Sequence, residues 1–167
     1  MADSVRVDPD DLPGLHRWFG VELNNQTWQK LDEGSPTESS SEEERTQLLV
    51  GAFASAYHWS QIGTAANRVR GEHLISRTAL RVGEVALALT HARRCLALAT
   101  AHPDGVEDWD LGFAHEALAR ALAASDDTEG GREHLEQARR IAAAAKNRED
   151  REILEAEITR GEWFGLM

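Results

Sequence analysis

The sequence has a single cysteine, few prolines and no long apolar run, and each shortage excludes a class of protein. Cys95 is the one cysteine among 167 residues, which excludes an internal disulfide framework and a zinc site built from several cysteines. No stretch approaches the roughly 20 uninterrupted apolar residues that a membrane-spanning helix needs. We therefore expect no disulfide cross-link and no membrane partner.

Basic residues are scarce relative to acidic ones. The chain carries 18 lysines and arginines against 29 aspartates and glutamates, a formal net charge of −11. Because phosphate contacts dominate nucleic-acid affinity, this balance argues against a nucleic acid as partner. Residues 1–11 contain acids and no apolar run, so we expect a flexible N-terminus without a secretory signal, and a cytoplasmic protein.

The chain has almost no signal for β-strands. No run of alternating β-branched or aromatic residues lies between turn residues, whereas Ala, Leu, Arg and Glu dominate. The four prolines lie outside the long periodic segments, the first of which has Leu15 as its first apolar residue. We therefore predict an all-α fold with a single domain over residues 12–167. About seven helices are expected, near residues 12–32, 42–62, 65–82, 85–102, 107–125, 128–146 and 148–159.

The first two expected helices are joined by residues 33–40. This segment is rich in Gly, Pro and Ser and cannot bury much surface, so we predict a mobile linker there. Ser41 and Glu44 then form a capping-box pattern that opens the second helix. On this helix the apolar residues expected to face the core are Leu48, Leu49, Ala52, Phe53, Ala56 and Tyr57.

Two segments of the chain align with each other at a constant offset of 43 residues. Most of the matching positions hold small residues, which would let two antiparallel helices approach closely. They are Ser76, Gly83, Ala88, Ala92 and Cys95 in the first segment, and Ala119, Asp126, Gly131, Leu135 and Ala138 in the second.

These residues resemble the tetratricopeptide repeat (TPR). That family has a small residue midway along the first helix of a hairpin, a turn of Gly and an acid, and alanines along the second helix. The Gly83-Glu84 turn, Ala88 and Cys95 follow this pattern. The resemblance covers about residues 68–145 and implies a TPR-like array of antiparallel helical hairpins, a short α-solenoid.

Three features depart from the family pattern. The period exceeds the usual one of about 34 residues, Glu72 and His115 stand where an early Trp is usual, and the second turn, Asp126-Asp127, lacks glycine. A longer period implies longer helices, as in several tetratricopeptide-like bacterial proteins. Because isolated repeats cannot bury their own faces, we expect the remaining helices to complete the stack as flanking or capping elements.

The resemblance also implies a binding surface, because in this family the first helix of each hairpin lines a concave face. Such a groove would recognise an acidic peptide, a protein partner or a small anionic ligand. The matching positions are Arg70, His73 and Arg77 from one hairpin, and Phe113, Glu116 and Arg120 from the next.

The spacing of these residues supports a shared face independently. His73 and Arg77, like Glu116 and Arg120, are i,i+4 pairs, so each pair lies on one side of its helix. Three arginines in one groove would hold a carboxylate or phosphate through their forked donors. The alternative is that the arginines pair on the surface with Glu72, Glu116, Asp108 or Asp110, at under about 1 kcal/mol each.

His58 is a further candidate ligand-binding residue, because it lies in the aromatic run Ala56-Tyr57-His58-Trp59. Four consecutive helical residues span most of the helix circumference and cannot all face one core. We expect Tyr57 to pack inward and His58 or Trp59 to face a groove. The alternative is a hydrogen-bonded histidine at a helix crossing.

The run Asp108-Trp109-Asp110 also has two interpretations. It could be a pair of carboxylates beside a binding aromatic residue. It could equally be a helix N-terminus with acids at the positive end of the dipole and Trp109 as a hydrophobic staple. The second interpretation explains both acids.

A second hypothesis for function is a small-molecule enzyme with a pocket on the middle helices. A histidine would carry the proton, a glutamate would act as base, and arginines would hold an anionic substrate. Neither a nucleotide-binding motif nor a nucleophile-elbow motif supports this hypothesis. The residues that would form such a pocket are His58, Glu72, Arg77, Glu116 and Arg120.

The seven histidines suggest metal chemistry by number but not by spacing. Neither Glu-x-x-His nor His-Glu-x-x-His occurs in the sequence. We therefore expect no metal and no cofactor. A site assembled from different helices, such as His58, Glu72 and His115, stays open.

Cys95 occupies a small-residue packing position, so we expect a buried and unreactive thiol. A reactive thiol would need exposure and a positive environment, which the neighbouring Arg93 and Arg94 could supply. The C-terminal residues 161–167 are apolar for a terminus, with a Trp-Phe-Gly-Leu run, and we expect them to dock. They either cover the edge of their own array or dock in a neighbouring chain and form a homodimer.

Overall fold

The computed structural model describes residues 10–167 and confirms the all-α fold. Within this range the chain forms seven α-helices, one short 3₁₀ helix and no strand. None of these helices is both long and apolar enough to span a membrane. The flexible N-terminus expected over residues 1–11 lies largely outside the described residues. The helices are α1 (Leu12–Glu33), α2 (Glu42–Ile62), α3 (Ala65–Arg81), α4 (Val85–Ala101), α5 (Asp108–Ala124), α6 (Thr128–Ala144) and α7 (Arg148–Thr159), with the 3₁₀ helix η1 (Pro103–Gly105) between α4 and α5.

Capping side chains set the starts of the helices. At α2 the predicted capping box is present, with the N–H of Ser41 donating to Oε2 of Glu44 at 3.0 Å. At α3 the N–H of Thr64 donates to Oδ1 of Asn67, also at 3.0 Å. Each such contact satisfies a backbone donor that the first turn of a helix leaves unpaired.

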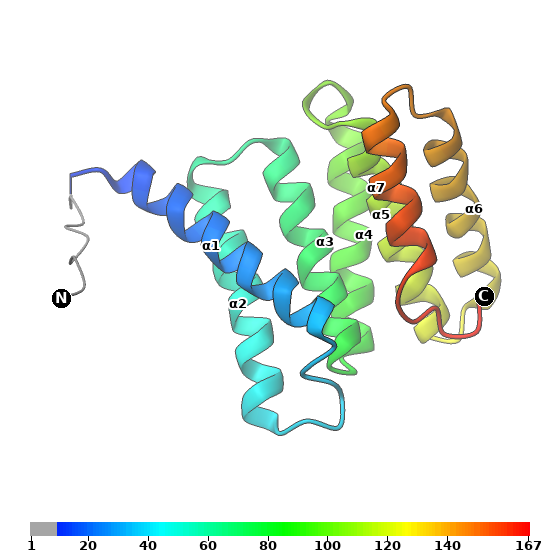
Figure 1. The fold of residues 1–167 in the computed structure, drawn as a ribbon, viewed down its shortest axis with the longest axis horizontal. Helices are drawn as coiled ribbons and strands as arrows, with labels where there is room; N and C mark the ends of the chain where they lie inside the picture. The colour runs from blue at the N-terminus through cyan, green and yellow to red at the C-terminus, as the bar shows by residue number, and fades with distance from the viewer. Residues whose placement is uncertain (1–9) are drawn as a thin grey trace.

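Each helix packs against the next one in the chain, and α1, α3, α5 and α7 also contact one another in succession. The helices follow one another across the molecule, from α1 and α2 at one end to α6 and α7 at the other (Figure 1). The alternate helices α1, α3, α5 and α7 therefore lie together, and their side chains meet on one face.

The hairpins α3–α4 and α5–α6 repeat with the period found in the sequence. All four helices have 17 residues, and the bounds of the second hairpin follow those of the first by 43 residues. Gly83 (φ 80°) and Asp126 (φ 68°) both adopt the left-handed conformation in the hairpin turns. In each turn the next residue's N–H bonds to the carbonyl five residues earlier, at 2.9 and 3.0 Å, as in a Schellman motif. The 43-residue repeat of the sequence is therefore also a repeat of helix bounds and turn conformation.

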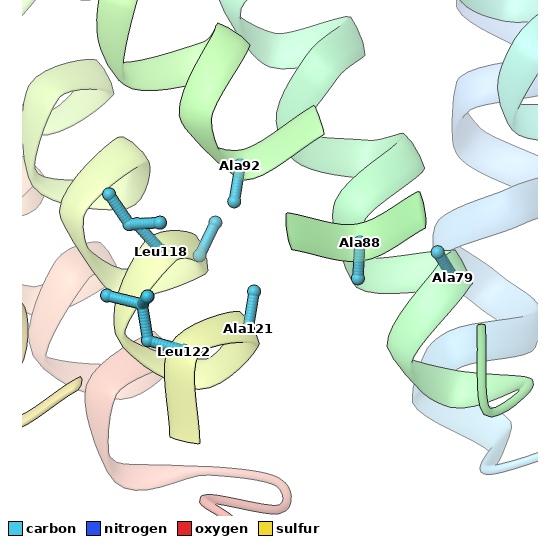
Figure 2. Close-up of a cluster of buried hydrophobic side chains, with 7 residues drawn as sticks. Ala79, Ala88, Ala92, Leu118, Ala121 and Leu122 are labelled. Atoms are coloured by element: carbon cyan, nitrogen blue, oxygen red, sulfur yellow. The ribbon is translucent and has the colours of Figure 1, made fainter. Parts of the chain in front are cut away.

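Small side chains bring α3, α4 and α5 close together. Ala79, Ala88 and Ala92 are fully buried and form one cluster with Leu118 and Leu122 of α5 (Figure 2). Alanine keeps the helix axes near each other, while burial of a leucine side chain contributes about 2 kcal/mol. This packing fixes the relative positions of α3 and α5, which carry most of the predicted site residues.

The prediction for the inner face of α2 is wrong at two positions. Leu48 and Ala52 are buried as expected, but Phe53 is 40 % and Tyr57 is 58 % exposed. The buried stripe of α2 continues from Ala52 to Ser55, whose hydroxyl donates to the carbonyl of Gly20 at 2.8 Å. A small polar residue faces α1 because the two helices approach closely there, and the larger aromatic side chains are turned outward.

Residues outside the helices pack against them. In the segment expected to be a mobile linker, Pro36 is buried and the N–H of Thr37 donates to Oγ of Ser40 at 3.0 Å. In the tail, Trp163 is 5 % exposed and belongs to a cluster with Leu135 and other residues of α5, α6 and α7. The tail thus packs on its own chain.

Cys95 is fully buried, as predicted. Its Sγ donates to the carbonyl of Val69 at 3.3 Å. Burial is the main cause that raises the pKa of this thiol, and the carboxylates of Glu72, Asp110 and Glu116 raise it further. The thiolate, which is the reactive form of cysteine, is therefore disfavoured.

Candidate functional site

The face shared by α1, α3, α5 and α7 contains a groove of about 420 Å³. Its walls are predominantly apolar, and each of the four helices contributes to them. The groove is lined by Asn24 and Trp28 of α1, Arg70 and His73 of α3, Trp109 and Phe113 of α5, Ile153, Ala156 and Glu157 of α7, and Arg160 directly after α7.

Aromatic rings form the floor of this groove. The imidazole of His73 lies between Trp28 and Phe113, stacked on both, with ring centroids 5.6 and 5.2 Å apart. Trp109 meets the ring of Phe113 edge to face at 5.4 Å. Such contacts fix the rings in place, since stacked and edge-to-face pairs are favoured over loose packing. The floor is therefore a set of aromatic rings packed against one another.

Arg70 forms one charged side of the groove. Its Nε and Nη2 donate to the two carboxylate oxygens of Asp110, at 2.8 and 3.1 Å, and its guanidinium lies 4.3 Å from the ring centre of Trp109. The Asp110 side chain is fully buried, and it also accepts from the N–H of Glu107 at the start of α5. The Arg70 side chain is 41 % exposed. A helix-start acid thus anchors an arginine that still faces the groove.

A buried carboxylate, Glu116, lies under the aromatic floor. Its Oε2 is 3.0 Å from Nε2 of His73, and its Oε1 accepts hydrogen bonds from Arg77 and Arg120. Burial raises the pKa of Glu116, but the charge of Arg77, the hydrogen bond with His73 and the charge of Arg120 together lower it more, to about 2. Glu116 is therefore a carboxylate at neutral pH.

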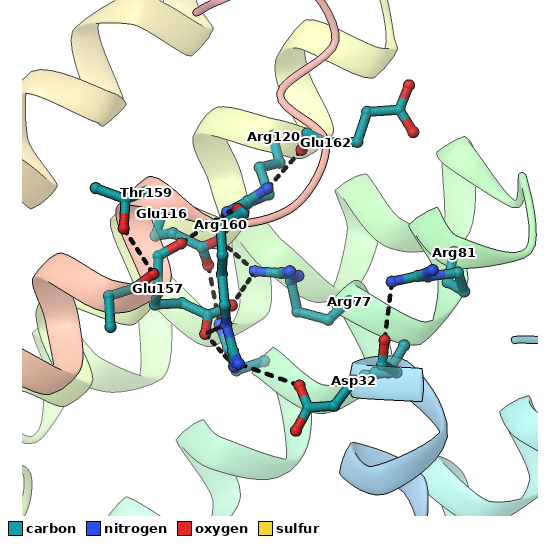
Figure 3. A network of polar contacts seen from close by, with 12 residues as sticks. Asp32, Arg77, Arg81, Glu116, Arg120, Glu157, Thr159, Arg160 and Glu162 are labelled. Atoms are coloured by element: carbon teal, nitrogen blue, oxygen red, sulfur yellow. Dashed lines mark hydrogen bonds and ion pairs between the residues drawn. The ribbon is translucent and has the colours of Figure 1, made fainter. Parts of the chain in front are cut away.

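Arg120 connects this carboxylate to the C-terminal segment (Figure 3). It donates to the backbone carbonyls of Glu157, Arg160 and Glu162, and its guanidinium lies 3.8 Å from the ring centre of Trp163. Burial lowers its pKa to about 10, against the opposing effect of Glu116. Arg120 remains a cation at neutral pH and satisfies carbonyls at the end of α7.

Glu157 and Arg160 join α7 to the other helices. Glu157 accepts from Arg77 of α3 and from Nε of Arg160. Nη1 of Arg160 in turn donates to Oδ1 of Asp32 at 3.1 Å, which connects the end of α7 to the end of α1 (Figure 3). The charges balance within this network: Arg77, Arg120 and Arg160 face Glu116, Glu157 and Asp32.

A second cavity, of about 470 Å³, lies near the C-terminal end of α3. It is bounded by residues 37–39, the α3–α4 turn and the C-terminal segment, and Arg77 and Arg120 line it. Arg81 lines it too, and donates from Nη2 to the carbonyl of Leu31 at 3.0 Å. Among the predicted arginines, only Arg70 therefore lines the aromatic groove.

The structure brings together five of the six predicted ligand-binding residues. Arg70 and His73 line the aromatic groove, and Glu116 links His73 to Arg77 and Arg120 beneath it. The arginines also pair with carboxylates, as the alternative interpretation expected. The carboxylates involved, those of Asp110 and Glu116, are however buried and not on the surface.

His58 lies apart from these residues. Its Nδ1 is 2.9 Å from Nδ1 of His16, and its ring stacks on Phe19. Burial, followed by the charge of His16, lowers the pKa of His58. Glu72 faces α4, where it pairs with His91 and Arg94. The five residues of the enzyme hypothesis therefore belong to three separate sets of contacts.

Sequence analysis missed the groove residues of α1 and α7. These helices lie outside the 43-residue repeat, so no offset placed them on the shared face. A signal was present in α7, where Ile153, Ala156, Glu157 and Arg160 follow the i, i+3, i+4, i+7 spacing of one helix face. Trp28 of α1 lies in an apolar helical repeat with Leu23 and Leu31, but that repeat does not show whether its face meets the core or the groove.

Comparison with protein-family models found no match, and neither a curated protein nor a solved structure matches the chain. The resemblance to the tetratricopeptide repeat therefore stays a prediction from the residues.

Proposed function

We propose that the chain is a TPR-like binding module whose aromatic groove holds an acidic peptide segment of a protein partner. The observation that carries this proposal is the groove of about 420 Å³ among α1, α3, α5 and α7, with a preformed aromatic floor and arginines at its sides. The use of these alternate helices agrees with the tetratricopeptide resemblance, which implies a concave face lined by first helices.

The aromatic floor supports a ligand with an apolar or aromatic side chain. Trp28, Trp109 and Phe113 are all partly exposed, and Ile153 beside them is 47 % exposed. Covering such surface contributes roughly 25 cal/mol per Å². Because stacking already fixes the rings, little side-chain entropy is lost on binding.

The arginines support a carboxylate next to that apolar side chain. Arg70 uses Nε and Nη2 on Asp110, so the donors of Nη1 face outward from the pair. Arg160, directly after α7, lines the groove, and its side chain is half exposed. A carboxylate between these two guanidinium groups would accept charge-assisted hydrogen bonds. Arg70, which pairs with Asp110, and Arg160, which pairs with Glu157 and Asp32, are the two guanidinium groups that line the groove, so a preference for acidic ligands would depend on their remaining donors.

The experiment is selection from a phage-displayed library of random twelve-residue peptides on the full chain. We expect the enriched peptides to carry an aromatic or large aliphatic residue flanked by Asp or Glu. Trp109→Ala and Arg70→Met should each weaken binding of a selected peptide at least about tenfold, as is typical of Trp and Arg at interface centres. Affinities are measured by isothermal titration calorimetry.

Matched controls lie outside the groove. Trp18→Ala removes an exposed tryptophan of α1, and Arg132→Met removes an exposed arginine of α6; both should leave the affinity unchanged. The proposal is contradicted if no peptide is enriched, if the enriched peptides are basic, or if the groove variants bind as tightly as the controls.

A further inference from the structure

The second cavity, at the C-terminal ends of α1 and α3, has no part in the proposed function. Its volume of about 470 Å³ lies within the range of roughly 300–1,000 Å³ that small-molecule sites occupy. Segments far apart in the sequence form its wall, namely the ends of α1 and α3, residues 37–39 and the C-terminal segment. The chain therefore has a second place with room for a small molecule.

Two arginines of α3 line this cavity with unused donors. Arg81 donates from Nη2 to the carbonyl of Leu31, but its Nε and Nη1 have no hydrogen-bond partner within residues 10–167, and no carboxylate of that range pairs with it. Nε and Nη2 of Arg77 are unused as well, since its bonds to Glu116 and Glu157 both come from Nη1. Arg77 and Arg81 are an i,i+4 pair, a spacing at which like charges repel each other. A carboxylate in the cavity would relieve this repulsion.

Two glycines leave room beside these guanidinium groups. A Cβ at Gly161 would lie 3.6 Å from Nη2 of Arg77, and a Cβ at Gly34 would lie 3.7 Å from Nη1 of Arg81. A larger side chain at either position would fill the space next to the unused donors. Glycine keeps that space open.

An acid without a partner lines the same cavity. The carboxylate of Glu38 makes no hydrogen bond or ion pair with the described part of the chain, although Arg81 lines the cavity too. Its Oε2 lies beside the α3–α4 turn, 3.3 Å from where a Cβ at Gly83 would be. The carboxylate of Glu162 points away from Arg77 (Figure 3). Because the C-terminal ends of helices favour a positive charge, an ammonium group beside Glu38 would be stabilised by the carboxylate and by the ends of α1 and α3.

We propose that this cavity binds a small zwitterion of the α-amino acid class with an apolar side chain. The carboxylate of the ligand accepts charge-assisted hydrogen bonds from Arg77 and Arg81, and its ammonium group faces Glu38. Since Arg81 and Glu38 line one cavity without pairing with each other, a ligand with both charges satisfies both. Partly exposed apolar side chains on the wall contact the side chain of the ligand; they are Leu80, Val85 and Phe164.

Arg120 also lines the cavity but does not bind the ligand directly. Its Nε donates to Glu116, and its two terminal nitrogens donate to backbone carbonyls of the C-terminal region. These bonds hold the C-terminal segment in place as a wall of the cavity. A bound ligand therefore contacts this segment, and binding should stabilise the folded chain.

The test is calorimetric titration of the full chain with L-leucine and with two analogues. Isocaproate lacks the ammonium group of leucine, and isoamylamine lacks the carboxylate. We expect one equivalent of L-leucine to bind with a Kd on the order of 1 mM or below. Each analogue should bind at least about tenfold more weakly, because it leaves a charged group of the site unpaired. L-leucine at about ten times Kd should raise Tm by about 4 °C.

Variants separate the two charges of the ligand. Glu38→Gln should weaken binding of L-leucine at least about tenfold and leave binding of isocaproate unchanged, whereas Arg81→Met should weaken both. Glu136→Gln and Arg132→Met, on the exposed face of α6, are the matched controls and should leave both affinities unchanged. Trp109→Ala changes the aromatic groove and should also leave binding of L-leucine unchanged.

Four outcomes overturn the proposal. The first is that L-leucine does not bind below about 10 mM. The second is that isocaproate binds as tightly as L-leucine, since a negative charge alone would then account for the site. The third is that Trp109→Ala weakens binding of L-leucine, which would place the ligand in the aromatic groove. The fourth is equal affinity of Glu38→Gln and wild type for L-leucine, a comparison that holds even if Arg81→Met fails to fold.

Discussion

The contacts of Glu116 determine where the neighbouring arginine side chains point. Its side chain is fully buried, and three potential cations, His73, Arg77 and Arg120, meet on its two oxygens. A buried carboxylate is tolerated only when its partners replace the lost water. The same contacts remove Arg77 and Arg120 from the aromatic groove, because both guanidinium groups are turned toward the carboxylate.

Replacing Glu116 with glutamine tests this role. Glu116→Gln keeps the shape but leaves the buried Arg120 and the partly buried Arg77 facing an amide, so the free energy of unfolding at pH 7 should fall by about 3 kcal/mol. Urea denaturation followed by circular dichroism measures the change. Glu136→Gln, on the exposed face of α6, is the control and should change the value by less than about 0.5 kcal/mol.

The lowered pKa of the same carboxylate predicts how the stability of the protein depends on pH. The pKa of Glu116 is about 2 in the folded protein against 4.5 for an ordinary glutamate, so the unfolded chain binds more protons between these values. Its contribution to stability is present above about pH 4.5 and is lost as the pH falls toward 2. The difference between wild type and Glu116→Gln should therefore shrink between pH 5 and pH 3. An unchanged difference over that range would count against this assignment.

At the scale of helices and turns, the two equivalent hairpin turns adopt the same left-handed backbone conformation with different residues. Gly83 and Asp126 both have positive φ, a conformation that an L side chain adopts with strain. A Cβ at Gly83 would also meet the Cβ of Glu38 at 3.1 Å. The first turn therefore depends on glycine more than the second does.

This difference gives a matched pair of variants. Gly83→Ala should lower the free energy of unfolding by about 1–2 kcal/mol, because it adds left-handed strain and the contact with Glu38. Asp126→Gly relieves strain at the equivalent turn and should change stability by less than about 0.5 kcal/mol or increase it. Chemical denaturation measures the free energy of unfolding of both variants. Equal decreases in the two variants would contradict the predicted difference between the turns.

The sequence predicted the helices more completely than the site. Proline, glycine and capping residues mark the ends of helices locally, so the expected α2 and α3 start where Ser41 and Thr64 cap them. The 43-residue offset placed His73 and Glu116 at equivalent positions, and they contact each other. Trp28 could not be placed, because its position depends on how α1 packs across α3, and no pattern within α1 encodes that.

At the scale of the whole molecule, the C-terminal segment closes the end of the array. Trp163 is buried in the cluster formed by α5, α6 and α7, and its ring lies on the guanidinium of Arg120. An apolar end that packs in this way covers surface that a further hairpin would otherwise cover. Association of two chains through the C-terminal segment would require this segment to detach from its own chain first.

Trp163→Ala should therefore lower the free energy of unfolding by about 3 kcal/mol, as expected for a buried tryptophan. Trp18→Ala removes a tryptophan that is 58 % exposed and should have an effect below about 0.5 kcal/mol. Light scattering provides a second readout: we expect the same molar mass for wild type and Trp163→Ala. A halved mass in the variant would show instead that the tail holds two chains together.

The contact between Arg160 and Asp32 has a consequence for the way the protein melts. A linear array in which each unit touches only its neighbours unfolds in stages from its ends. Here an ion pair between two half-exposed side chains spans 128 residues and joins the residue after α7 to the end of α1, so it opposes fraying at either end by up to about 1 kcal/mol. We expect one cooperative transition, with coincident tryptophan fluorescence and circular dichroism curves. In Arg160→Ala the two curves should separate, while in Arg148→Ala, which breaks only a local pair with Glu152, they should still coincide.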